Sequence, residues 1–339
     1  MQVIDEALLR IVSAHAGEKQ VFAQAPTPMT GGFWATIHGF ELDHPPTDLA
    51  GPLVLRVMPR GDAAIRETIV QRAVAEQGYR TPRVVLDGFD AEVGGAFMVM
   101  ERAEGHAPLE SLGIGPALLC LPKTIRGVAR QLSVAAVQLH ELDPQPIRER
   151  FAGAGIDNAS LGVEARRDEI RVAAQAGFVG FEELLAWLEH RRPALTPEVV
   201  CHGDIHPFNM LVTDDDSFSM LDWTNANLCR REYDVGFTAA LLHCAPIAVP
   251  RLARRPVGAI TGALSRRFIG AYRRMAPVNL DIVEWFETLQ YGRCLAAAAT
   301  APLVNDGIVG PGHPFRVSAP AMVRQVEMIT GVTIALGPT

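Results

Sequence analysis

CHGDIHPFNMLV at residues 201–212, followed by MLDW at residues 220–223, is the most informative part of the sequence. It sets two carboxylates and one carboxamide, those of Asp204, Asp222 and Asn209, at fixed spacings. Between Asn209 and Asp222, apolar stretches lie on both sides of an acidic turn, and this pattern predicts a short strand hairpin. Such a hairpin would bring the three side chains to one edge, where their oxygens suit magnesium and a phosphoryl group.

The chemistry of Mg²⁺ explains these residue types. The ion prefers oxygen ligands and usually takes only one or two carboxylates beside substrate phosphates. Asp222 can supply a carboxylate and Asn209 a neutral oxygen, which leaves Asp204 to accept a proton from an attacking hydroxyl. Protein kinases divide the work in the same way, with an asparagine five positions after the catalytic aspartate. Asn209 follows Asp204 by the same five positions.

Two other interpretations of the motif stay open at this point. The acidic and amide side chains could cap local backbone groups, as such residues often do in turns. Cys201, His202 and His206 could instead bind zinc, which uses ligands of this kind. Pro207 argues against a helix that carries both histidines on one face, and no second cysteine pair lies nearby.

The motif resembles that of the aminoglycoside phosphotransferase and choline kinase-like superfamily of small-molecule kinases. HGDxHPxN at residues 202–209, LDW at 221–223 and YDVG at 233–236 carry the resemblance. It implies an α+β, two-lobed protein-kinase-like fold, ATP or GTP as phosphoryl donor, and Mg²⁺. We expect a lobe with an antiparallel sheet and a helix at residues 1–103, and a mostly helical lobe at residues 104–339.

The resemblance also implies roles for single residues. Asp204 would be the catalytic residue, Asn209 and Asp222 the metal ligands, and Asp234 a buried support for the catalytic loop. His140, at the end of a helix expected over residues 125–142, is interpreted as a packed structural histidine.

The strand expected at residues 53–57 carries a charge. Strand alternation sends Val54 and Arg56 to one face, which in a kinase-like lobe looks into the nucleotide cleft. The family usually has lysine at the position of Arg56, where the cation pairs the nucleotide phosphates. Arginine also binds phosphate, in bidentate fashion. The alternative is a surface arginine on an edge strand.

The helix expected over residues 63–77 supplies a partner for that cation. Glu67 matches the superfamily's helix carboxylate that pairs with the strand cation, although Glu76 or solvent could serve equally well. Backbone N–H groups at Gly31 and Gly32 could approach a phosphate closely, although a glycine pair is also an ordinary hairpin turn.

The segment at residues 100–105 resembles the hinge between kinase lobes. There the backbone of Glu101 and Ala103 would hydrogen-bond adenine.

Composition narrows the setting. The chain has 339 residues, of which 48% are hydrophobic, a formal net charge of −7 and a pI near 5.8. It has no run of lysine or arginine, so we expect no nucleic-acid partner. Its five cysteines form no close pairs, which indicates reduced thiols in a cytoplasmic protein. No signal peptide and no apolar stretch long enough for a membrane span are evident.

The leading hypothesis is therefore an O-phosphotransferase that acts on a hydroxyl of a small molecule. Similar proteins use aminoglycosides, macrolides, choline-like amines, sugars and nucleoside-like alcohols, and the sequence does not choose among them. An antibiotic is one such acceptor. The alternative hypothesis is a nucleotide-binding pseudoenzyme or regulatory module on the same fold, which the arginine at position 56 favours.

Overall fold

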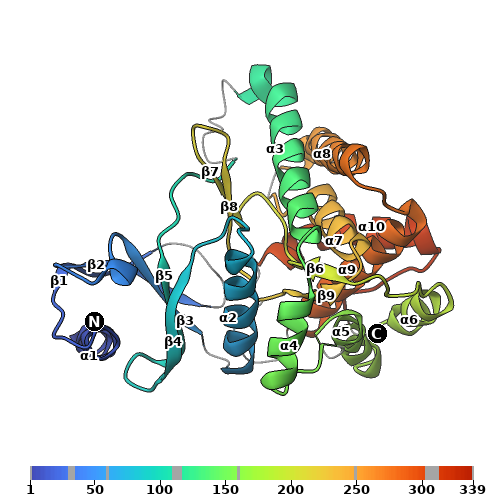
Figure 1. Cartoon of the computed structure of the whole chain (residues 1–339). Helices are drawn as coiled ribbons and strands as arrows, with labels where there is room; N and C mark the ends of the chain where they lie inside the picture. The colour runs from blue at the N-terminus through green and yellow to red at the C-terminus, as the bar shows by residue number, and fades with distance from the viewer. Residues whose placement is uncertain are drawn as a thin grey trace. The chain divides into compact units, whose positions relative to one another are not determined.

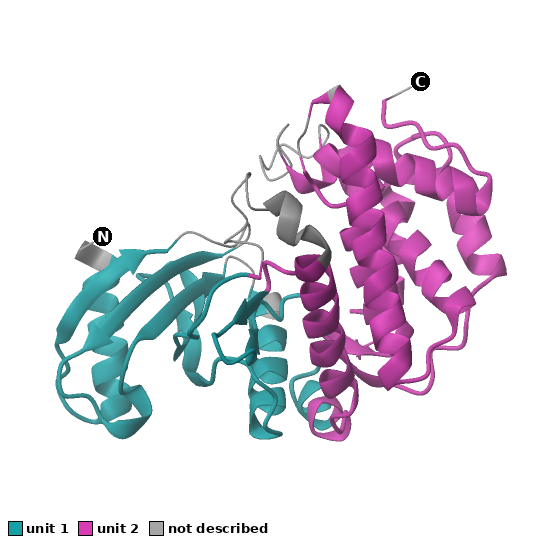
Figure 2. Cartoon of the chain, turned by 90° about the horizontal axis from the view of Figure 1, so that it is seen from above, with its two compact units in different colours: residues 1–107, 149–156, 210–226 teal, residues 108–148, 157–209, 227–339 magenta. Residues whose placement is uncertain are grey.

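The computed structural model describes residues 2–29, 35–58, 61–108, 117–158, 161–247, 250–301 and 313–337. Contacts group the chain into two compact units, coloured separately in Figure 2. Unit 1 consists of residues 1–107, 149–156 and 210–226. Unit 2 consists of residues 108–148, 157–209 and 227–339. Unit 1 therefore includes two segments from later in the chain, residues 149–156 and residues 210–226, and the second of these contains Asp222. The lobe boundary expected at residues 103–104 stays a prediction.

Unit 1 is built on a five-stranded antiparallel sheet (Figure 1). Its strand order is β1-β2-β3-β5-β4, with bounds β1 Phe22–Pro28, β2 Thr36–Leu42, β3 Leu53–Met58, β4 Val84–Asp90 and β5 Gly95–Glu101. Two helices pack on the sheet, α1 (Gln2–Ala16) and α2 (Gly61–Glu76). A short 3₁₀ turn lies at Thr47–Leu49.

Strand alternation in β3 assigns its side chains to two apolar clusters. Leu53, Leu55 and Val57 belong to the cluster that contains α1 residues. Met58 belongs to the cluster that contains Ala64 of α2. Because alternate residues of a strand share a face, Arg56 lies on the α2 face of the sheet.

The predicted hairpin after Asn209 is confirmed. Strands β7 (Met210–Val212) and β8 (Phe218–Met220) pair antiparallel. His106 and Val212 exchange backbone hydrogen bonds of 3.0 and 2.9 Å, which ties the hairpin to the chain after β5. Gly105 is needed there, because it has φ +110° and a Cβ would lie 2.6 Å from the carbonyl oxygen of Val212.

Unit 2 is mostly helical. Its helices are α3 Ala117–His140, α5 Val163–Gln175, α6 Phe181–His190, α7 Glu232–His243, α8 Arg254–Met275, α9 Leu280–Thr300 and α10 Pro314–Thr330, with a short 3₁₀ turn at Arg251–Ala253. The helix α4 (Gln145–Gly153) contributes to both units. Strands β6 (Val199–Cys201) and β9 (Asn227–Cys229) pair antiparallel beside the motif. The predicted α+β class is confirmed.

The core of unit 2 surrounds α9. This helix packs against α5, α7 and α10, while α8 packs against α3 and α7 (Figure 1). Its aromatic residues Trp285 and Phe286 are fully buried in one large apolar cluster. Within the described residues, no helix combines the length and apolarity that a membrane crossing requires.

Candidate active site

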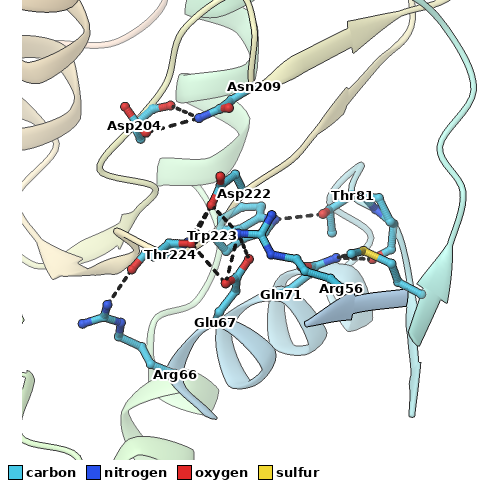
Figure 3. A network of polar contacts seen from close by, with 12 residues as sticks. Arg56, Arg66, Glu67, Gln71, Thr81, Asp204, Asn209, Asp222, Trp223 and Thr224 are labelled. Carbon is cyan, nitrogen blue, oxygen red and sulfur yellow. Dashed lines mark hydrogen bonds and ion pairs between the residues drawn. The ribbon is translucent and has the colours of Figure 1, made fainter. Parts of the chain in front are cut away.

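Arg56 is buried in unit 1 and sits among three oxygen acceptors (Figure 3). Its Nη2 lies 3.2 Å from Oε1 of Glu67 and 3.0 Å from Oδ1 of Asp222. The same nitrogen lies 3.1 Å from the hydroxyl oxygen of Thr224. Arg56 is only 6% exposed, so the surface-arginine interpretation is wrong.

One nitrogen of this guanidinium makes all of these hydrogen bonds, and another has no partner among the described residues. All of its hydrogen bonds to Glu67, Asp222 and Thr224 go through Nη2. The Nε of Arg56 is buried and has no hydrogen-bond partner within the described residues. A buried donor without a partner is costly to the folded state, and the Nε of Arg167 shares this condition within the described part of the chain.

Glu67 is the carboxylate that pairs with Arg56. It projects from α2 and is 1% exposed. Burial raises the pKa of Glu67 to about 7, while the Arg56 charge opposes this rise and the Asp222 charge adds to it. The alternative partner, Glu76, is instead engaged by Arg150 at the unit's surface.

Asp222 follows β8 in an uncommon backbone conformation. Its φ is +63°, in the left-handed region that aspartate tolerates better than most residues. The Thr224 hydroxyl oxygen lies 2.6 Å from Oδ1 of Asp222 and 3.1 Å from Oε2 of Glu67. Its single proton can serve only one carboxylate at a time. The two carboxylates thus share one hydroxyl and one guanidinium.

The residue after Asp222 anchors this turn in the apolar part of unit 1. Trp223 is fully buried, and its Nε1 donates a 2.9 Å hydrogen bond to the hydroxyl of Thr81 (Figure 3). Thr81 donates in turn to the carbonyl of Met220 at 2.9 Å. The indole also packs edge-on against Tyr79. Asp222 is therefore held by its neighbours on both sides in sequence.

Two members of this cluster were not predicted. Thr224 contacts both carboxylates, and Arg66 donates a 2.6 Å hydrogen bond to the carbonyl of Thr224. The position of Thr224 two residues after Asp222 was the only available signal, since Asx and Thr side chains often bond within such turns.

Asp204 and Asn209 lie together in unit 2 (Figure 3). The Asn209 Nδ2 donates to the backbone oxygen of Asp204 at 3.1 Å and lies 3.3 Å from its Oδ2. The backbone N–H of Asn209 donates to the carbonyl of His206 at 3.0 Å, which closes the loop. The local bonding considered for Asn209 is thus present through its Nδ2. The Asp204 side chain is 28% exposed, so an external hydroxyl can reach it.

Asp234 supports the start of this loop from α7. Its carboxylate accepts hydrogen bonds from the backbone N–H groups of His202 at 2.8 Å and Gly203 at 2.6 Å. His140 Nε2 lies 3.1 Å from the same carboxylate. Asp234 and His140 are 0% and 5% exposed, so both are structural members of the core beneath the loop.

The zinc interpretation finds no support in the geometry. Within the described part of the chain, the one cluster with metal-ligating atoms close together is His140, Cys201 and Asp234. Its carboxylate is already occupied by backbone amides. Burial and the nearby Asp234 charge raise the pKa of the Cys201 thiol well above its ordinary value, which disfavours the thiolate that zinc requires.

The other nucleotide-site candidates are spread over unit 1. Val54 is buried in β3, and Glu101 ends β5, where its N–H donates to the carbonyl of Arg83. Ala103 lies in the segment after β5. Gly31 and Gly32 lie outside the described residues.

Comparison with known proteins agrees with this arrangement. The phosphotransferase enzyme family matches residues 47–278, which is well over half of the chain. No curated protein sequence matches significantly.

Solved structures share the fold at low sequence identity. A putative aminoglycoside phosphotransferase from Ralstonia eutropha JMP134 superposes with a TM-score of 0.62 at 16% identity, covering 96% of this chain and 98% of that one. A thermostable mutant of aminoglycoside phosphotransferase APH(4)-Ia, in complex with AMP-PNP and hygromycin B, gives 0.61 at 16% identity, with 94% and 98% covered. Spectinomycin phosphotransferase APH(9)-Ia, in complex with ADP and spectinomycin, gives 0.58 at 16%, with 96% and 97% covered.

The fold of these structures is the one described above, and the family match includes both the Arg56 cluster and the Asp204 loop. The chain therefore belongs to the phosphotransferase enzyme family.

Proposed function

We propose that this protein transfers the terminal phosphoryl group of ATP or GTP to a hydroxyl of a small molecule, with Mg²⁺ as cofactor. The observation that carries the proposal is the state of Arg56. It is a buried cation, fixed by Glu67 and Asp222 through Nη2, with an unpartnered Nε.

Arg56 fits the role of phosphate ligand. Arginine can hold phosphate with two donors at once. The Glu67 carboxylate and the Thr224 hydroxyl fix the guanidinium beforehand, so little side-chain freedom is lost when nucleotide binds. The residue that replaces the expected lysine is therefore suited to the same task. Gly31 and Gly32 remain predicted phosphate contacts.

The proposed adenine contact is at the segment after β5. The Ala103 N–H makes no hydrogen bond within the described residues, so it is free to bind a base edge. The N–H of Glu101 is already used by Arg83, which leaves its carbonyl as the proposed contact. Val54 would pack against the base from β3.

The donor set also fits Mg²⁺. Asp222 offers a carboxylate whose side chain is 24% exposed, and Asn209 offers an amide oxygen. One carboxylate and one neutral oxygen beside phosphate are typical of magnesium in kinase-type sites. When bound, the ion would neutralise charge that develops on the phosphates.

Asp204 is the proposed catalytic residue. It would accept a hydrogen bond from the attacking hydroxyl, orient it, and take its proton as the oxygen–phosphorus bond forms. The hydrogen bonds from Asn209 and the support of the loop by Asp234 fix its position. Most of the rate then comes from positioning and from stabilisation of charge.

The acceptor is a small molecule with a hydroxyl group. Similar structures hold hygromycin B and spectinomycin, and we propose an acceptor of this general class, with amines and other alcohols as further candidates. An ADP-release screen with ATP and with GTP over antibiotics, amino alcohols, sugars and nucleosides would identify it. Tight nucleotide binding without ADP release on any acceptor would instead favour the pseudoenzyme hypothesis.

Asp204→Asn tests the catalytic assignment. The variant should lose phosphoryl transfer and keep nucleotide affinity, because it removes the proton acceptor alone. Asp214→Asn, in the exposed turn between β7 and β8, is the matched control and should keep full activity. Near-normal turnover of Asp204→Asn would show that Asp204 is not the catalytic residue.

Asp222→Ala tests the metal assignment. It should weaken nucleotide binding in the presence of Mg²⁺ and have a smaller effect in its absence. A titration of a fluorescent nucleotide with and without Mg²⁺ measures both. An identical loss under the two conditions would mean that Asp222 acts only by holding Arg56.

A further inference from the structure

A chain of buried polar groups connects α8 with the loop that carries Asp204. The Tyr272 hydroxyl lies 2.8 Å from His140 Nδ1. His140 Nε2 lies 3.1 Å from Oδ2 of Asp234. Asp234 accepts the two backbone amides at the start of the loop. Tyr272 and Asp234 are 0% exposed and His140 is 5% exposed, and all three belong to unit 2.

The hydrogen-bonding capacities of these groups determine where the protons lie. An ionised carboxylate only accepts hydrogen bonds, and Asp234 accepts them from two amides. His140 must therefore present N–H, not a lone pair, at Nε2. In a neutral imidazole the other nitrogen, Nδ1, is then an acceptor and needs a donor. The Tyr272 hydroxyl is positioned to be this donor, and it stays protonated because burial raises the pKa of Tyr272.

Without the Tyr272 hydroxyl, both neutral tautomers of His140 are unfavourable. His140 could keep its tautomer and leave Nδ1 buried without a partner, which destabilises the folded state. Alternatively the proton could move to Nδ1, and a lone pair on Nε2 would then face the carboxylate of Asp234 at the 3.1 Å contact. That repulsion would displace Asp234 from the amides of His202 and Gly203.

We propose that Tyr272 is a positioning residue, whose hydroxyl holds His140 in the Nε2–H tautomer so that Asp234 keeps the Asp204 loop in place. The argument for the tautomer depends only on these contacts and not on the activity of the protein. The expected effect on turnover rests on the proposed phosphotransfer function. Asp204 follows Gly203 directly, so a shift of the loop amides moves the catalytic carboxylate with them.

Tyr272→Phe removes the hydroxyl and keeps the ring. Tyr291→Phe is a matched control, because Tyr291 is also a fully buried tyrosine of unit 2. Its hydroxyl has no hydrogen-bond partner at geometric hydrogen-bond distance within the described residues. The Cys244 thiol and the Glu287 carboxyl lie near it, and no histidine among the described residues hydrogen-bonds to it. Loss of a hydroxyl as such affects both variants, whereas loss of the donor to His140 affects only Tyr272→Phe.

The first measurement is the tautomer of His140 by ¹⁵N NMR of histidine-labelled protein. The signal can be assigned among the ten histidines by its loss in His140→Gln. Wild type and Tyr291→Phe should show Nε2–H, and Tyr272→Phe should show a mixture or Nδ1–H. Amide hydrogen exchange at His202 and Gly203 should accelerate only in Tyr272→Phe.

The second measurement is steady-state kinetics. In Tyr272→Phe, kcat should fall by up to about tenfold, the equivalent of one net hydrogen bond. The KM for nucleotide should change little, and Tyr291→Phe should keep both parameters. An unchanged tautomer with unchanged amide exchange would overturn the proposal, as would equal kinetic effects of the two variants. If wild type transfers phosphate to no acceptor, the proposed function fails, but the tautomer and exchange results still decide the role of Tyr272.

Discussion

Replacing Glu287 with glutamine should stabilise the protein at pH 8 and leave its stability unchanged near pH 4.5. Glu287 lies on α9 in unit 2, partly buried, and no hydrogen bond or ion pair is found for it among the described residues. Burial, and next the charge of Glu284, raise the pKa of Glu287 from 4.5 to about 8. Glutamine has nearly the shape of the protonated side chain and carries no charge at any pH.

The size of the effect follows from linkage between protonation and folding. The folded-state pKa lies above the unfolded one, so the unfolded chain releases this proton first as pH rises. The favourable contribution of protonated Glu287 is therefore complete below pH 4.5 and is lost progressively up to about pH 8. A shift from 4.5 to about 8 sets a ceiling of about 5 kcal/mol, at about 1.4 kcal/mol per pKa unit. Residual exposure allows water to solvate the carboxylate, so we expect about half of this ceiling.

Denaturant unfolding at a series of pH values measures the difference directly. The curves of wild type and Glu287→Gln should coincide near pH 4.5 and separate steadily towards pH 8. Glu183→Gln, on the exposed side of α6, should follow wild type throughout. A difference that stays constant over this range, or a wild type that is more stable than Glu287→Gln at pH 8, would refute the reasoning.

Three further predictions concern other parts of the chain. The acceptors around Nη2 of Arg56 need a cation. Arg56→Lys should therefore retain measurable phosphoryl transfer, whereas Arg56→Met should lose nucleotide affinity in a binding titration. Gly236→Ala should destabilise the protein by about 1–3 kcal/mol in thermal unfolding, since its Cβ would lie 2.6 Å from Cβ of Phe286; Gly258→Ala on α8, with open space around it, should not. Thiol titration of the native protein should leave the four buried cysteines unlabelled until denaturant is added, because burial raises their pKa values; the four are Cys201, Cys229, Cys244 and Cys294.

Local patterns in the sequence were sufficient for several elements of unit 1. The expected strand at residues 53–57 is β3, and the expected helix at residues 63–77 is α2. Both signals are short-range, since they depend on alternation and on helical spacing over a few residues. The order β1-β2-β3-β5-β4 was not predicted, because the pairing of β3 with β5 is a long-range choice that no local pattern encodes.

The same distinction applies to the candidate site. The spacing of Asp204 and Asn209 is a local feature, and their hydrogen bond within one loop agrees with it. The pairing of Arg56 with Glu67 was expected from the resemblance to the kinase-like family and is present. Tyr272 gave no signal at all, because it lies 132 residues from His140 and reaches it only through the packing of α8 on α3.

Position 56 holds arginine where the family usually has lysine, and the structure changes how this departure is interpreted. From the sequence it was the best argument for a protein that binds nucleotide without catalysis. In the structure, one nitrogen of the guanidinium meets Glu67, Asp222 and Thr224, as a single ammonium would. The additional donor, Nε, is buried without a partner. Arginine therefore keeps the contact with the helix carboxylate that the resemblance expects of the strand cation. The departure from lysine at position 56 is therefore no argument against a phosphotransferase, because the arginine keeps this contact.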